Sequence, residues 1–489
     1  MRALLLRASI KRSLSSDFSR RSLTPGQLMF LCALWVLLFP PDVRGSGRQS
    51  ASPASNRLNV LFLFADDMRF DTIAALGNRE IRSPHLDRLV DQGFVFEQCC
   101  IMGSTMPAVC IPSRAMLMSG RSLWRTPTDL KGVPSLPEIL RQQGVVTFAT
   151  GKWHNGKPSF ARAFSAGRAI FFGGMTDHSK VPIYDFDPTG QYRKSSEKVG
   201  EKFSSELFAH AAIEFLRGHS PDQPFFCYVG FCAPHDPRTP PEAFARLYDP
   251  AKLTLPGNFL PEHPFDNGEL KVRDELLAPF PRTPEVIREH LAAYYGMISH
   301  LDAEVGRILQ TLEELGLAAK TIIVFSADNG LAVGQHGLLG KQNLYEHSVR
   351  VPLVLKGPNV PRGRSKALVY LHDLMPTLCD VFGVPAPEGV EGRTLWPIIR
   401  GETETLRDCV LLSYRNEQRA IRRGNWKLIM YEVQGRSTVQ LFDLANDPEE
   451  RENLTYDPKH AQTRTELEKL LFEARAAAGD PLISSTEMP

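Results

Sequence analysis

The side chains best suited to chemistry in this sequence lie directly after short apolar runs. Four such runs, at 60–65, 145–150, 225–230 and 322–326, are each followed within a few residues by charged or polar groups. Those groups are Asp66 and Asp67, Lys152 and His154, His235, and Asp328 with Asn329. Parallel strands in an α/β sheet bring their carboxyl ends to one edge, where such folds place their sites. The sequence therefore predicts that these groups converge, although the chain separates them widely.

The acidic members of this set indicate a metal site. They are Asp66, Asp67 and Asp328, with the amide of Asn329 beside them. Hard oxygen ligands of this kind suit calcium or magnesium. Three carboxylates packed together would also repel one another unless a cation lay among them. The Asp66–Asp67 pair alone could be a helix cap or a turn, but a second acidic pair after another strand favours the metal site.

Basic residues expected near the same edge would complete a receptor for an anion. They are Arg114, Lys152, His154, His235 and Lys341. Taken singly, each could be a solvated surface charge, and His154 could be a structural histidine. Together with a divalent cation they would bind a tetrahedral oxyanion, and sulfate esters and phosphate esters both fit that description.

The segment Cys110–Arg114 places a cysteine at the start of a predicted helix. Pro112 suits the first turn of a helix, and residues 115–118 continue it. A helix N-terminus favours anions through its free amide donors and its dipole. A cysteine there would have a lowered pKa and could act as a nucleophile, and the alternative is a buried, inert thiol.

The same segment resembles the signature of the sulfatase family. Cys110-Ile-Pro-Ser-Arg114 matches Cys-x-Pro-Ser-Arg, and other motifs of that family occur in the expected order. They are Asn59-Val-Leu-Phe-Leu-Phe-Ala-Asp66-Asp67, Thr150-Gly-Lys152-Trp-His154, Ala233-Pro-His235, Ser326-Ala-Asp328-Asn329-Gly330 and Gly337-Leu-Leu-Gly-Lys341. The chain departs from the family at Ser119-Gly120-Arg121, where Thr-Gly-Arg is usual, but serine keeps the hydroxyl.

The resemblance implies two cofactors and a partner enzyme. A dedicated formylglycine-generating or sulfatase-maturing enzyme would oxidise Cys110 to Cα-formylglycine, whose hydrate supplies the attacking hydroxyl. One Ca²⁺ ion would be held by the group derived from Cys110 together with Asp66, Asp67, Asp328 and Asn329. Among the basic residues, Lys152, Lys341 and Arg114 would meet the charge on the sulfate oxygens. His235 would protonate the leaving oxygen, and His154 would help to expel sulfate.

The pattern of apolar runs predicts an α/β fold with a large, mixed but mostly parallel sheet sandwiched by helices. A fifth run at 351–355 is also typical of a buried parallel strand, and helices are expected at 85–93, 203–216 and 283–315. The pattern of the sequence changes near residue 400. There the sequence predicts a smaller antiparallel sheet and one helix, with strands at 409–414, 418–421, 426–431 and 439–444 and the helix at 461–478. We therefore expect a catalytic domain over 58–400 and a C-terminal subdomain over 401–489.

The N-terminus has the layout of an export signal. Residues 1–46 contain a basic stretch and then an apolar run at 28–39, and a polar, flexible segment follows at 47–57. The alternative is an uncleaved membrane anchor, and both the Sec and the twin-arginine routes fit. The net charge of +2 comes from this leader, because residues 1–48 hold eight basic and two acidic residues. The remainder is slightly acidic, which argues against a nucleic-acid partner, and we expect a secreted or periplasmic protein without a stable membrane span.

The sequence says least about the substrate. The segment 171–178 could line a substrate pocket, and His178, Trp153 and Tyr345 are candidate contacts that could equally be structural. Export favours a sulfated polysaccharide or glycosaminoglycan-type sugar, and a small ester such as choline sulfate is the alternative. A phosphonate or phosphate ester hydrolase of the same superfamily and a glycan-binding protein on a sulfatase scaffold are the other interpretations.

Overall fold

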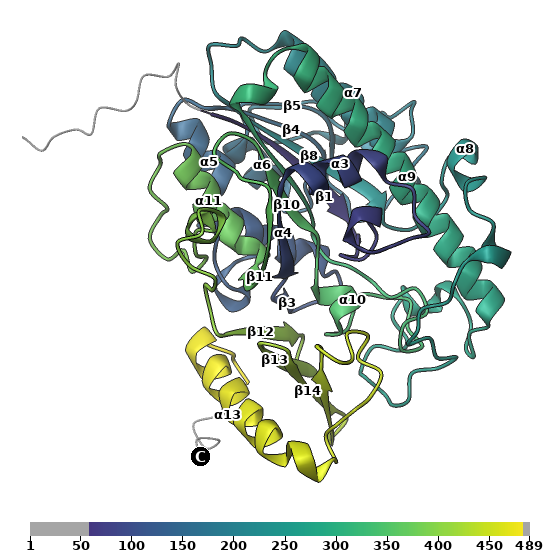
Figure 1. Ribbon diagram of the computed structural model, residues 1–489. Helices are drawn as coiled ribbons and strands as arrows, with labels where there is room; N and C mark the ends of the chain where they lie inside the picture. Colours follow the sequence, from purple (N-terminus) through teal and green to yellow (C-terminus); the bar gives the residue numbers. More distant parts are fainter. Residues whose placement is uncertain (1–57, 483–489) are drawn as a thin grey trace, which may run out of the picture. The chain divides into compact units, whose positions relative to one another are not determined.

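The computed structural model describes residues 58–482, which belong to one compact unit of the chain. Its centre is an eight-stranded sheet with the strand order β11-β2-β10-β9-β1-β8-β4-β5. The strands are β1 (Asn59–Asp66), β2 (Phe94–Cys100), β4 (Val146–Lys152), β5 (Ala166–Phe171), β8 (Phe225–Pro234), β9 (Thr321–Ala327), β10 (Leu353–Lys356) and β11 (Gly363–Tyr370). Figure 1 shows the sheet between two groups of helices, which confirms the predicted α/β sandwich.

The centre of the sheet is formed by the predicted apolar runs. β1, with the sequence NVLFLFAD, is buried along its whole length because it is apolar on both faces. It pairs in parallel with β8 on one side and with β9 on the other, and β8 pairs in parallel with β4. Strands buried on both faces carry such continuous apolar sequences. The four strands followed by reactive residues are therefore immediate neighbours.

Helices cover both faces of this sheet (Figure 1). One group consists of α3 (Pro84–Gln92), α7 (Ser204–Gly218) and α9 (Pro284–Glu314). The other group consists of α4 (Cys110–Ser119), α5 (Leu136–Gln142), α6 (Lys157–Ala163) and α11 (Leu374–Val381). The long helix α9 begins where Thr283 accepts a hydrogen bond from the Val286 amide, and Gly316 follows its end with a φ of 67°. The three predicted helices are confirmed as α3, α7 and α9.

One predicted strand runs in the opposite direction. The run at 351–355 was expected to be parallel, but β10 starts at Leu353 and pairs antiparallel with both β9 and β2. Its burial on both faces gives it the same apolar sequence that a parallel strand would have, so composition alone does not reveal its direction. Strands β2, β5 and β11 were not predicted, because their mixed polar sequences reflect positions nearer the sheet edges.

The C-terminal part forms a second sheet with the order β15-β14-β13-β12-β3. Its antiparallel strands are β12 (Cys409–Tyr414), β13 (Gln418–Arg423), β14 (Trp426–Val433) and β15 (Arg436–Asp443), and α13 (Ala461–Ala478) packs on them. The short strand β3 (Gly103–Ser104) joins this sheet from the catalytic part and pairs in parallel with β12. A side chain at Gly103 would lie 1.9 Å from the Ser413 carbonyl oxygen, so this strand pair requires glycine there.

Several small elements complete the description. They are α8 (Glu242–Ala245), α10 (Glu346–Val349), α12 (Trp396–Ile399) and the paired strands β6 (Pro182–Ile183) and β7 (Lys198–Val199). Within residues 58–482, no helix is both long enough and apolar enough to cross a membrane. The predicted export signal at 1–46 and the segment at 47–57 lie outside the described residues.

Candidate active site

The structure brings the reactive residues together at the carboxyl edge of four adjacent strands. Asp66 ends β1, Lys152 ends β4, His235 follows β8 and Asp328 follows β9. In the sheet these strands lie in the order β9-β1-β8-β4. Groups that are far apart in the chain therefore face one another, as the parallel arrangement predicts.

Helix α4 carries Cys110 to the same edge. Cys110 is the first residue of α4 and is buried. One turn on, the Ser113 hydroxyl donates a hydrogen bond to the Asp328 carbonyl oxygen at 2.5 Å. The Arg114 guanidinium donates through Nε to Asp328 Oδ2 at 2.8 Å and through Nη1 to the Lys152 carbonyl oxygen at 2.9 Å. These bonds fix the start of α4 against the ends of β4 and β9.

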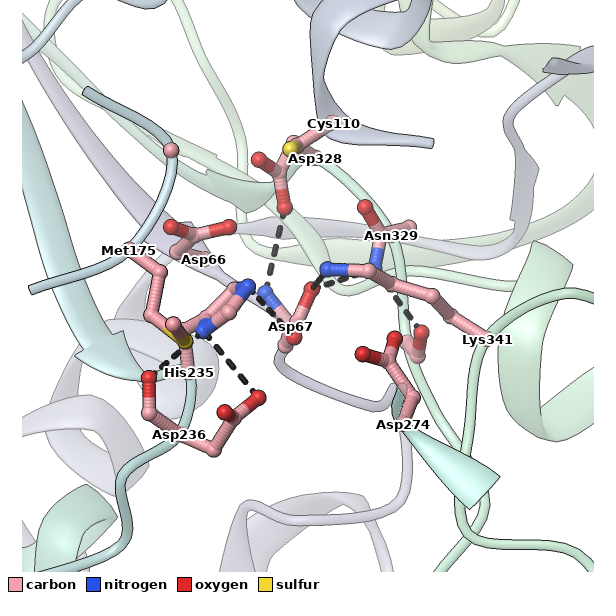
Figure 2. A network of polar contacts seen from close by, with 12 residues as sticks. Asp66, Asp67, Cys110, Met175, His235, Asp236, Asp274, Asp328, Asn329 and Lys341 are labelled. Carbon is pink, nitrogen blue, oxygen red and sulfur yellow. Dashed lines mark hydrogen bonds and ion pairs between the residues drawn. The ribbon is translucent and has the colours of Figure 1, made fainter. Parts of the chain in front are cut away.

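Each buried carboxylate of the site has a basic partner, and Figure 2 shows one of these pairs, Lys341 with Asp67. Lys152 Nζ lies 2.5 Å from Asp66 Oδ2, and Lys341 Nζ lies 2.6 Å from Asp67 Oδ1. Asp328 is paired with the arginine of α4. These three bases offset the mutual repulsion of the three carboxylates, so that repulsion does not by itself require a metal ion. The case for a metal has to rest on the ligand atoms themselves.

Those atoms do fit a cation with oxygen ligands. Among the described residues, Asp66 Oδ1 and Asn329 Oδ1 are buried without a hydrogen-bond partner. Asp66, Cys110 and Asp328 also each present one ligand atom, and these atoms lie within 4.8 Å of one another. Asn329 donates through Nδ2 to Asp67 Oδ1 at 2.7 Å, which leaves its own oxygen free. Buried oxygens that lack donors are the groups that a calcium ion would satisfy.

The thiol of Cys110 lies against two of the predicted catalytic groups. Its Sγ is 3.3 Å from His154 Nδ1 and 3.6 Å from Lys152 Nζ. Burial raises the pKa of Cys110, although the two lysines of the site oppose this shift. The expectation that the helix N-terminus lowers the pKa of Cys110 is therefore wrong, because the loss of hydration on burial outweighs the effect of the helix. As a thiol, this group is a poor nucleophile at neutral pH.

The electrostatics of the histidines and of Asp67 follow from burial and from the surrounding charges. Burial and the neighbouring Lys152 lower the pKa of His154, and burial also lowers the pKa of His235 although Asp67 opposes this shift. Asp67 behaves differently: burial would raise its pKa, but His235 and Lys341 together lower it. The His235 ring is held through Nδ1, which donates to the Asp236 carbonyl oxygen at 2.8 Å.

A cavity of about 260 Å³ opens above Cys110. The predicted residues His154, His235 and Lys341 line it. Three polar lining residues, which sequence reasoning missed, are Arg273, Asp274 and Gln342, and Met175 also lines the cavity. Met175 belongs to the segment 171–178, so that segment does contribute to the cavity as expected.

The three candidate substrate contacts lie elsewhere. Trp153, His178 and Tyr345 are buried and do not line the cavity. The indole of Trp153 donates to Ser159, the hydroxyl of Tyr345 donates to Gln440, and His178 Nε2 donates to the carbonyl oxygen of His235. All three are structural, and His178 supports the backbone beside a proposed catalytic residue.

Comparison with known protein families decides the identity of the chain. The family described as Sulfatase matches residues 58–384, and the family described as N-sulphoglucosamine sulphohydrolase, C-terminal, matches residues 334–477. The chain belongs to the sulfatase family. Together the two matches cover the catalytic part and the small C-terminal sheet.

Known relatives of this sulfatase extend over most of its length. An arylsulfatase from Clostridium perfringens is 26% identical, covering 85% of this chain and 94% of its own. Among solved structures, an enzyme in complex with its substrate D-glucosamine-2-N,6-O-disulfate superposes with a TM-score of 0.72 at 21% identity, covering 87% of this chain and 98% of its own. A phosphonate monoester hydrolase of Agrobacterium radiobacter superposes with a TM-score of 0.68 at 24% identity, and the match covers 86% of this chain and 96% of that hydrolase.

Two residues of the sulfatase site adopt a backbone conformation that is rare outside glycine. Asp67 has a φ of 64° and His154 a φ of 65°. Each lies just after the end of a strand, Asp67 after β1 and His154 after β4. Such conformations cost on the order of 1–3 kcal/mol and persist where the surroundings enforce them, as they do in many active sites.

Proposed function

We propose that this sulfatase hydrolyses sulfate esters of sugars through a Cα-formylglycine made from Cys110, with one calcium ion beside it. The position of Cys110 Sγ carries the proposal. It shares a ligand cluster with Asp66 and Asp328, and it lies within 3.6 Å of Lys152 and 3.3 Å of His154. A thiol with a raised pKa stays protonated and is a poor nucleophile. A hydroxyl group at the same position, with the same basic neighbours, could attack the sulfur of a bound sulfate ester.

Two groups would have to be supplied from outside. Oxidation of Cys110 by a maturing enzyme would give an aldehyde, whose hydrate offers one hydroxyl to attack sulfur and a second that allows sulfate to be eliminated. Calcium would add positive charge next to the sulfate oxygens, with Asp66, Asp67, Asp328 and Asn329 as the proposed protein ligands. Ser119 and Gly120 retain the hydroxyl and the glycine of the second half of the maturation signal.

The remaining roles belong to side chains of the chain itself. We assign binding of the sulfate oxygens to Lys152 and Lys341, whose ammonium groups flank Cys110 and the cavity. Arg114 would orient the nucleophile, because its buried Nη2 has no hydrogen-bond partner among the described residues. Because Nδ1 donates to a carbonyl oxygen, His235 would have to be protonated at both ring nitrogens to give a proton from Nε2 to the leaving oxygen. Asp67 Oδ2, 3.5 Å from Nε2, favours that charged ring. His154, beside Cys110, would take the proton when sulfate is expelled.

We propose a sulfated sugar as the substrate and export as the route to it. The solved enzyme with a related fold acts on a sulfated glucosamine, and the small cavity suits one sugar ring rather than a length of polymer. The basic and apolar pattern of residues 1–46 supports export to the periplasm or the exterior, where sulfated polysaccharides occur.

The test combines mass spectrometry with turnover measurements. Protein from a host that contains a maturing enzyme should show formylglycine at Cys110, and Cys110→Ala should lose at least about 10⁴-fold in kcat while keeping its circular dichroism spectrum. Cys379→Ala, which changes a buried cysteine of α11, is the matched control and should remain active.

Three results would contradict the proposal. Active protein with an unmodified thiol would exclude the formylglycine mechanism. Faster turnover of an aryl phosphate or an aryl phosphonate than of the matched aryl sulfate would make the protein a phosphoric ester or phosphonate ester hydrolase. Binding of sulfated sugars without turnover by fully converted protein would identify a glycan-binding protein instead.

A further inference from the structure

The mouth of the cavity contains a polar network that the proposed chemistry does not use. It consists of Arg273, Asp274 and Gln342, which line the cavity, together with Asp236, which does not line the cavity but is paired with Arg273. These four residues are here called the mouth cluster. Arg273 donates through Nη1 and Nη2 to the two carboxylate oxygens of Asp236, and through Nη2 to Asp274 Oδ1 at 2.5 Å. Gln342 Nε2 donates to Asp274 Oδ2 at 2.8 Å. The cluster is therefore held in place before any ligand arrives.

The charges of the mouth cluster do not suit a second anion. The Arg273 side chain is 46% exposed, whereas the carboxylates of Asp236 and Asp274 are almost fully buried beside it. Hydrogen bonds and the charge of Arg273 lower the pKa of Asp236, although burial opposes this, so that group is ionised. Both terminal nitrogens of Arg273 are already occupied by the carboxyl groups of Asp236 and Asp274. An added sulfate or carboxylate that touched Arg273 would lie close to the ionised Asp236 and to the carboxyl group of Asp274.

The hydrogen-bonding capacity that remains is that of a sugar site. Each carboxylate oxygen can accept more than one hydrogen bond. Nη1 of Arg273 also donates to Met175 Sδ at 2.8 Å, so Nε is the donor of Arg273 that has no hydrogen-bond partner among the described residues. Acceptors and donors thus alternate over a short distance. Adjacent hydroxyl groups, which both donate and accept, satisfy such a row, whereas an anion can only accept.

The rest of the cavity argues against the other small esters. Within residues 58–482, no phenylalanine, tyrosine or tryptophan lines it. A quaternary ammonium such as choline is bound by aromatic faces, and an aryl group would pack on them. The exposed Met175, beside Arg273, is one of the apolar side chains of the cavity that the face of a ring could contact.

We propose that the mouth cluster recognises neighbouring hydroxyl groups of the sugar ring that bears the sulfate, and that this ring carries no second anionic group at those positions. The proposal rests on the proposed function. It is supported by the cavity itself, because His235, Arg273 and Asp274 line it together. Since Nε2 of His235 is assigned to the leaving oxygen, the ring attached to that oxygen would occupy the same cavity as Arg273 and Asp274.

The experiment compares selectivity rather than activity alone. The full-length, formylglycine-containing protein is given a panel of hexoses that carry one sulfate, the corresponding sugars with a second sulfate, and 4-nitrophenyl sulfate. The quantity measured is the ratio of kcat/KM for the best sugar to kcat/KM for the aryl ester. Arg273→Met and Asp274→Asn should each lower this ratio by at least about tenfold, because each removes contacts to hydroxyls that the aryl ester lacks.

The design also includes a matched control variant and a comparison of doubly with singly sulfated sugars. Arg246→Met, which changes an exposed arginine directly after α8 and outside the cavity, should leave the ratio unchanged. Wild-type protein should turn over the doubly sulfated sugar at least about tenfold less efficiently than the best singly sulfated one, and Asp274→Asn should narrow that gap.

The outcomes separate this inference from the proposed function. Equal losses on the sugar and on the aryl ester would show that the cluster acts by positioning His235 and would overturn the inference. Preference for the doubly sulfated sugar, or turnover of the aryl ester with none of the sugars, would overturn it as well while leaving a sulfatase. Failure of converted wild-type protein on every substrate would instead overturn the proposed function.

Discussion

Removal of calcium should destabilise the folded protein by a measurable amount. The proposed ligands come from β1, α4 and the turn after β9, and only the folded sheet brings them together. An unfolded chain presents the same groups far apart, so the cation would bind almost entirely to the native state. Its binding free energy is then added to the free energy of unfolding.

The size of the effect can be worked out in advance. A ligand present at 100 times its Kd adds about 2.7 kcal/mol to the free energy of unfolding. The described region has about 425 residues, and an unfolding entropy of roughly 2.1 cal/mol/K per residue gives about 0.9 kcal/mol/K. The melting temperature should therefore rise by about 3 °C when a chelated sample is saturated with calcium.

Calorimetry of the wild type and of Asp328→Asn tests this. The variant should lose most of the calcium-dependent shift. It should also melt lower without calcium, because breaking its buried ion pair with Arg114 costs about 3–5 kcal/mol. Asp373→Asn is the control, since Asp373 is equally buried and accepts two hydrogen bonds from Arg407, at 2.5 and 2.7 Å, away from the site. Asp373→Asn should lower the melting temperature measured without calcium but keep the calcium-dependent rise in melting temperature. A full shift in Asp328→Asn would refute the assigned ligands.

Three further substitutions have definite expected outcomes. In Gly174→Ala the new methyl group would lie 2.8 Å from the ring of His154. The value of kcat should therefore fall by about 100-fold while the fold is unchanged, and an unchanged kcat would contradict the assigned position of His154. Lys341→Met removes the lysine partner of Asp67, which keeps its hydrogen bond from Asn329. The value of kcat should fall by at least about 100-fold while titration calorimetry still detects calcium, and loss of calcium binding would assign Lys341 to the metal site. Burial raises the pKa of Asp302 to about 7, so the folded state binds more protons than the unfolded state between pH 4 and 7. The free energy of unfolding should therefore fall as pH rises through that range. Relative to wild type, the free energy of unfolding of Asp302→Asn should increase by up to about 4 kcal/mol by pH 8. Urea unfolding of both proteins at pH 5 and pH 8 would measure this difference.

The convergence of the site could be predicted because it follows from backbone topology. Asp66, Lys152 and Asp328 end or follow parallel strands, and parallel strands fix the position of whatever follows them. The direction of β10 could not be predicted, because a strand buried on both faces has the same composition in either orientation. The charge balance was also missed, since the pairing of Asp67 with Lys341 depends on the path of a long loop.

The substrate side of the site was predicted least well, and the reason is physical. Tyr345 and Trp153 looked like contacts because aromatic side chains near a motif are often exposed to ligands, but the same side chains fill a core equally well. Arg273 gave no signal, because it lies in an irregular segment with neither apolar periodicity nor a motif. Its partner Asp236 is one residue beyond His235, so only their contact in space reveals a shared role. Strand ends are therefore where a sequence reveals reaction chemistry, whereas the side chains that select the substrate emerge only from folded loops.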